Sequence, residues 1–73
     1  MNNFDYTISV MPIIPPLQKK DGYYGFEATL RIFIDGSNNP IIRNEIHGRN
    51  ESEAKQEAEK LAEEERAKRG YEI

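Results

Sequence analysis

Few side chains in this chain have the chemistry of a catalytic or metal site. Cysteine is absent, which excludes thiolate nucleophiles, disulfides and zinc–thiolate clusters. The single histidine, His47, has no second imidazole with which to hold a metal, and no serine stands in the Gly-x-Ser-x-Gly turn of a hydrolase nucleophile. The sequence therefore predicts a protein that is not an enzyme, without catalytic, metal-binding or cofactor-binding residues and without an evident small-molecule substrate.

Acidic side chains are numerous, but their spacing indicates a helix surface rather than a pair of catalytic carboxylates. They lie close together in the last third of the chain, where charged side chains of a helix are expected to face solvent. These residues are Glu57, Glu59, Glu63, Glu64 and Glu65. Gly22 and Gly25 lack the spacing of a phosphate-binding loop, and we expect them to form a turn that enters a strand.

The charge of the chain is small and unevenly distributed. The 73 residues carry a formal net charge of −3. Residues 1–49 contain five basic and five acidic side chains, whereas residues 50–73 contain five basic and eight acidic ones. This composition lacks the basic surface typical of nucleic-acid binders. Since neither a signal peptide nor an apolar run of about 20 residues is present, we expect a cytoplasmic protein that has no membrane partner.

The first predicted strand covers residues 4–11, where apolar and polar side chains alternate with the period of a half-buried strand. Pro12 and the pair Pro15-Pro16 are expected to end it, because proline cannot donate a hydrogen bond to a sheet. Residues 15–22 are then predicted to form a mobile connection.

Two further strands follow. Residues 23–34 show the most regular alternation in the chain and predict the central strand. Residues 35–40 have turn composition, and residues 41–47 form a third strand in which Ile42 and Ile46 are expected to face inward. Side-chain parity then predicts a register between the second and third strands. The predicted pairs are Ile34 with Ile42, Leu30 with Ile46, and Arg31 with Glu45.

The last element is a predicted helix over residues 51–69. Asn50 is a favoured N-cap residue, and Glu53 at the third helical position completes a capping arrangement. Gly70 is a natural stop. One narrow face of the helix is apolar, which suits close packing on a sheet. Its residues are Ala54, Ala58, Leu61 and Ala62. Beyond this face the final turns have little to bury and are expected to extend past the sheet or to meet another chain.

Three consecutive strands followed by one helix predict an α+β domain. We expect a three-stranded antiparallel meander sheet packed on the C-terminal helix, in two layers, with residues 1–73 forming a single domain.

The segment FEATLRIFIDGSNNPIIRNEIHGRNESEAKQEAEKL, residues 26–61, resembles the C-terminal part of double-stranded RNA-binding domains. The shared features are an aromatic residue early in a strand, a glycine before the last helix and an EAK phrase whose alanines face the sheet. The resemblance implies a sheet covered by a helix and suggests RNA as an alternative ligand. The residues that would contact nucleic acid are Lys19, Lys20, Arg49 and Lys55.

Two departures from that family weigh against RNA binding. The family's first helix is replaced by a predicted strand at residues 4–10. The lysine pair that holds phosphates at the start of the last helix is replaced by Glu51, Ser52 and Glu53, and only Lys55 matches a basic position of that motif. Carboxylates at a helix N-terminus repel a phosphate from the place where it would bind.

The leading hypothesis is a protein–protein interaction or regulatory accessory module of the kind that phages and mobile elements encode. A domain this small buries only about 60% of the surface of its unfolded chain, so a protein partner or self-association is expected to add stability. The predicted binding surface is the sheet face opposite the helix, a sheet edge, or the acidic end of the helix. The predicted interface residues are Tyr23, Arg31, Phe33, Ile41 and Arg43.

Overall fold

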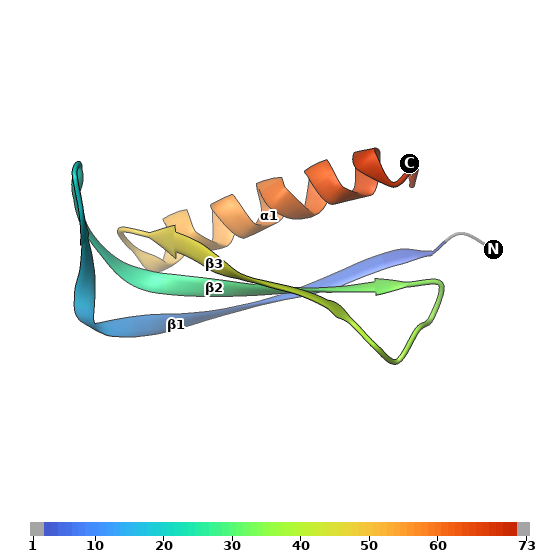
Figure 1. The fold of residues 1–73 in the computed structure, drawn as a ribbon, viewed down its shortest axis with the longest axis horizontal. Helices are drawn as coiled ribbons and strands as arrows, with labels where there is room; N and C mark the ends of the chain where they lie inside the picture. The colour runs from blue at the N-terminus through green and yellow to red at the C-terminus, as the bar shows by residue number, and fades with distance from the viewer. Residues whose placement is uncertain (1–2, 72–73) are drawn as a thin grey trace.

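The computed structural model describes residues 3–71. It contains three strands and a helix, in the order β1 (Phe4–Lys19), β2 (Gly22–Ile34), β3 (Ile41–Gly48) and α1 (Glu51–Lys68). The strands form one antiparallel sheet in the order β1-β2-β3, and α1 lies along one face of it (Figure 1). The predicted α+β architecture, a three-stranded meander with one C-terminal helix, is therefore confirmed. Within the described residues, no helix has both the length and the apolarity needed to cross a membrane.

The core is a single thin layer between the sheet and α1. It is made of three side chains of the central strand, one of β3 and three alanines of the helix. These buried residues are Ala28, Leu30, Ile32, Ile46, Ala54, Ala58 and Ala62. Alanines on the buried face allow the helix to approach the sheet closely. The approach is close at Gly48, where an added Cβ would overlap the backbone of Ala54.

The hairpin of β1 and β2 is longer than the sequence predicts. Pro12 does not end β1, because β1 is an edge strand, where a residue without an N–H is tolerated. Pairing continues from Leu17 opposite Tyr24 to Lys19 opposite Gly22. The predicted mobile connection over residues 15–22 is therefore wrong, since most of it is strand. We call residues 13–24, the far end of this hairpin, the arm.

The register of β3 also differs from the prediction. Ile41 pairs with Ile32, and Ile46 pairs with Ala28, so two residues of β3 lie opposite Thr29. This is a β-bulge, and it reverses the side-chain parity on the two sides of the extra residue. Consequently Ile42, which was predicted to face inward, is 53% exposed. Arg31 therefore pairs with Ile42 and not with Glu45, the partner that side-chain parity predicted.

The N-terminus of α1 agrees with the sequence. Asn50 is extended and its side-chain oxygen accepts a hydrogen bond from the backbone N–H of Glu53, which confirms the predicted N-cap. The last turn of α1 differs from the sequence prediction. Glu65 was predicted to face solvent but is only 4% exposed. The guanidinium of Arg66 lies over the ring of Phe4, and Tyr71 packs against the same ring, so the end of α1 is held on the sheet.

Candidate interaction surfaces

The arm is bent away from the plane of the rest of the sheet, toward the side on which α1 lies (Figure 1). The bend has a simple origin. Pro12 is opposite Phe26 and Leu17 is opposite Tyr24, so residues 13–16 of β1 face Gly25 alone. The surplus length in one strand forces the hairpin to curve, as bulges do. Prolines stiffen the bend because their φ angle is fixed.

Large apolar side chains are exposed at this bend and beside it. Ile14 is 87% exposed, Met11 and Tyr23 are each 62% exposed, and Leu17 is 38% exposed. We call these four residues the elbow patch. All lie on the β1–β2 hairpin, at or near its bend, and none of them is among the apolar residues that pack against the core. Of the four, only Tyr23 was among the predicted interface residues. The high apolar content of residues 10–17 was the sequence signal for the others.

A polar network holds the arm against the start of the helix. The hydroxyl of Tyr24 donates to Oδ2 of Asp21 at 2.7 Å, and Nη2 of Arg49 lies 2.9 Å from the same oxygen. Arg49 also donates to the backbone carbonyl of Asp21. The ring of Tyr24 lies beneath two cations, Lys19 at 4.6 Å and Arg49 at 5.1 Å from its centroid. The bent shape of the arm is therefore braced rather than left to the hairpin alone.

The same network shifts two titration equilibria. The hydrogen bond from Tyr24 is the main cause that lowers the pKa of Asp21 below its ordinary value of 3.8, and the charges of Arg49 and Lys19 act in the same direction. In return, the hydrogen bond to Asp21 is the main cause that raises the pKa of Tyr24 above 10.0. Both shifts favour the same state, an ionised carboxylate beside a protonated phenol.

His47 connects this network to the sheet face opposite the helix. Its Nε2 lies 3.6 Å from a carboxylate oxygen of Glu27, and its Nδ1 lies 3.2 Å from Nζ of Lys19. A lysine ammonium can only donate, so Nδ1 is the acceptor and Nε2 carries the proton directed toward Glu27.

The five predicted interface residues do not form one surface. Arg31 and Phe33 lie on the face opposite the helix, where a guanidinium nitrogen of Arg31 is 3.2 Å from Oγ of Ser9. Tyr23 is on the arm. Ile41 packs against the core, and Arg43 forms an ion pair with Glu65 of the helix. The bulge in β3 is the physical reason, because it moves Ile41 and Arg43 to the helix side.

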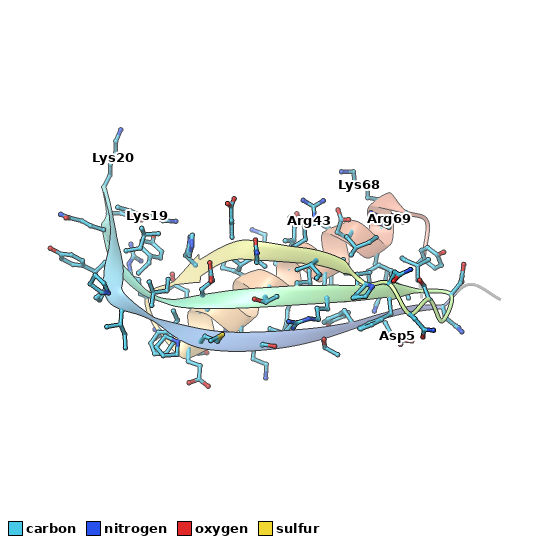
Figure 2. All side chains as sticks on the ribbon, turned by 60° about the horizontal axis from the view of Figure 1, so that its bottom comes forward. Asp5, Lys19, Lys20, Arg43, Lys68 and Arg69 are labelled. Atoms are coloured by element: carbon cyan, nitrogen blue, oxygen red, sulfur yellow. The ribbon has the colours of Figure 1, made fainter. Side chains whose placement is uncertain are left out.

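The predicted nucleic-acid contacts are only partly brought together. Lys19, Lys20 and Arg49 lie at the arm, and Figure 2 shows Lys20 projecting from its tip. Lys55 is exposed on α1, one turn beyond the start of the helix. Glu51 and Glu53 occupy the first turn of α1, and Asp21 neutralises Arg49. The resulting surface has mixed charge.

A further surface lies where β3 meets α1. Two adjoining hollows, of about 270 and 350 Å³, share the lining residues Glu45, Ile46 and Leu61. Near one end, Arg43 and Arg69 approach Glu65 from β3 and from the end of the helix, at 3.6 and 3.2 Å. Figure 2 shows Arg43 and Arg69 close together at this end of the molecule. We call this surface the β3–α1 groove.

The part of the chain that the structure describes holds no group of three or more histidine, cysteine or carboxylate side chains placed to bind a metal ion. No family model, curated protein or solved structure matches the chain. The resemblance to double-stranded RNA-binding domains therefore stays a prediction.

Proposed function

We propose that this protein is a non-enzymatic interaction module that binds another protein through the elbow patch. The exposure of Ile14, at 87%, is the observation that carries the proposal. Isolated exposed apolar side chains are ordinary, but a contiguous group of them is typical of a binding surface. Here four such side chains lie on one bent hairpin. Leu17 is opposite Tyr24 and Tyr23 is opposite Gln18, so Leu17 and Tyr23 point to opposite faces of the arm.

The construction of the arm supports this proposal. The prolines and the contacts of Arg49 with Asp21 hold the arm in one shape, so that little conformational freedom remains to be lost when a partner binds. Lys19 and Lys20 flank the apolar side chains. Because Asp21 lies beside these cations, a complementary partner surface would be apolar at its centre and of mixed charge at its rim.

This proposal replaces the sheet face opposite the helix as the main contact surface. Arg31 and Phe33 stay on that face as secondary contacts, while Ile41 and Arg43 are occupied elsewhere. We further propose a regulatory accessory role in the cytoplasm, of the type encoded by phages and mobile elements. Its support is the small size, the acidic composition and the lack of cysteine.

The test is to find a partner whose binding depends on the elbow patch. Ile14 is replaced by a photo-reactive amino acid in the full chain, and the proteins that it cross-links in cells of the source organism are identified and purified. Burying an isoleucine side chain contributes about 1.5–3 kcal/mol, so Ile14→Ser should weaken the purified complex about ten- to a hundredfold. Ile42→Ser is the matched control, because Ile42 is also exposed but lies outside the patch.

Binding of double-stranded RNA is the second candidate, and one observation favours it. Arg49 lies at the arm with Lys19 and Lys20, although it is far from this lysine pair in the sequence. This candidate predicts an affinity that falls steeply with salt and is lost in Lys19→Ala/Lys20→Ala, whereas Ile14→Ser leaves it intact. A titration of labelled protein with a short RNA duplex at low salt, followed by amide NMR shifts, distinguishes it from the protein-binding proposal.

A further inference from the structure

The β3–α1 groove has an open strand edge as one wall. Among the described residues, β3 is paired with β2 on one side and with no strand on the other. An edge strand offers unpaired N–H and C=O groups to any extended segment that lies beside it. The bulge at residues 44 and 45 leaves two regular stretches on this edge, residues 41–43 and 46–48.

The floor of the groove is apolar and its rim is acidic. Ile46 and Leu61 line both hollows, which gives an apolar side chain a place to rest. Three further lining residues are carboxylates, Glu45, Glu57 and Glu64, and Lys60 is the cation beside them. Arg43 also lines the groove, and it shares the single carboxylate of Glu65 with Arg69. These three side chains together contribute one positive charge, which with Lys60 is still fewer than the three carboxylates. The rim is therefore negative overall.

We propose that the β3–α1 groove binds an extended, cationic segment of a partner protein by strand addition. The backbone of that segment pairs with the free edge of β3. One of its apolar side chains rests on Leu61, and lysine or arginine side chains reach Glu57 and Glu64. Main-chain pairing supplies affinity and the side chains supply selectivity, as in other cases of strand addition. This site is separate from the elbow patch and does not depend on it.

Charge complementarity favours such a segment over a second copy of this chain. Two copies joined edge to edge through β3 would bring two sets of Glu57 and Glu64 to the same junction. The strand itself carries Arg43 and Glu45, so it adds no net positive charge to offset them. Like charges that face each other across an interface oppose association.

The experiment titrates the full-length labelled protein with a capped eight-residue peptide of alternating lysine and valine, and follows the amide NMR shifts. The proposal predicts shifts concentrated on residues 41–48 and around Leu61, with an affinity that decreases as salt is added. A peptide of alternating glutamate and valine should not bind. Equal binding of both peptides, or no shift on β3 at millimolar concentration, would overturn the proposal.

Variants of the protein and of the peptide distinguish binding in the groove from nonspecific attraction between opposite charges. Glu57→Gln/Glu64→Gln should weaken the lysine–valine peptide about three- to tenfold, while the matched pair Glu59→Gln/Glu63→Gln should not change its affinity. In an extended peptide, the N–H groups of adjacent residues point to opposite edges of the strand. A lysine–valine peptide with two adjacent N-methylated residues at its centre therefore cannot form a regular backbone ladder with β3 in either orientation, and it should bind weakly. If it binds as well as the parent peptide, strand addition is wrong.

Two further outcomes bear on the proposal. If the β3 amides of the free protein become protected as its concentration rises, a second copy already covers the edge and the proposal is wrong. Ile14→Ser should leave peptide binding unchanged. The groove proposal and the elbow-patch proposal can therefore be contradicted independently of each other.

Discussion

Nη2 of Arg43 on β3 lies 3.6 Å from Oε2 of Glu65 on α1, and this contact joins the edge of the sheet to the last part of the helix. The side chain of Glu65 is 5% exposed, whereas that of Arg43 is 48% exposed. Nε of Arg69 lies 3.2 Å from the other carboxylate oxygen, so both oxygens have a cationic partner. A buried carboxylate needs such partners, and here they also fix the wall of the β3–α1 groove.

Replacement of this buried carboxylate is the first prediction. Glu65→Ala should lower the free energy of unfolding by about 1–3 kcal/mol, because two guanidinium groups lose their partner. The arginines are partly exposed, so the loss should be smaller than for a fully buried ion pair. Urea unfolding measures the change. Glu59→Ala, at an exposed position of the same helix, should change stability by less than about 0.5 kcal/mol. Equal effects of the two substitutions would show that Glu65 is not engaged as described.

The second prediction concerns the close approach of the helix to the sheet. In Gly48→Ala the new methyl group meets the backbone of Ala54, and its distance to the Cβ of Ala54 would be 2.9 Å. Backbone atoms cannot rotate away, so the helix must move, and we expect a loss of about 1–3 kcal/mol of stability. Gly25→Ala is the control, because an added Cβ there has no neighbour within 4 Å. A Gly48→Ala protein as stable as the wild type would contradict this packing.

The third prediction follows from the network that braces the arm. The pKa of Asp21 is lowered chiefly by the hydrogen bond from Tyr24. A carboxyl whose folded pKa is below its unfolded value stabilises the fold above the unfolded value, and this contribution is lost as pH falls through the folded value. The arm contacts should therefore weaken below pH 3.8. For Tyr24, whose pKa is raised, the contribution is present below pH 10.0 and is lost as pH rises through the raised value.

The carboxyl carbon shift of Asp21, followed by NMR against pH, tests this coupling. The midpoint should lie below 3.8 in the wild type and should move upward in Tyr24→Phe, which lacks the donating hydroxyl. Tyr23→Phe removes a hydroxyl from the neighbouring exposed residue and should leave the midpoint unchanged. An unshifted midpoint in Tyr24→Phe would show that Tyr24 does not hold Asp21.

The sequence predicted the elements well because each has a strong local signal. The alternation over residues 23–34 and the cap at Asn50 depend on neighbours within a few positions. The register of β3 depends instead on the bulge opposite Thr29. Nothing in the residue types of Asn44 and Glu45 requires an extra residue there, and only the fit of Ile41 and Ile46 into one core selects it.

The arm and Glu65 were missed for different physical reasons. Local sequence rules predict that proline ends β1, although on an edge strand the missing N–H faces solvent and costs little. Glu65 was assigned to the solvated side of the helix because glutamate is seldom buried. Its burial depends on Arg43 arriving from β3, and that arrangement follows from the bulge.

The most direct test of the proposed function is the affinity of a purified partner for the wild type, for Ile14→Ser and for Ile42→Ser, measured by titration calorimetry. All three proteins should have the same unfolding free energy within about 0.5 kcal/mol, since both isoleucines are exposed. We predict that Ile14→Ser weakens binding about ten- to a hundredfold and that Ile42→Ser does not. If Ile14→Ser binds like the wild type, the elbow patch is not the binding surface.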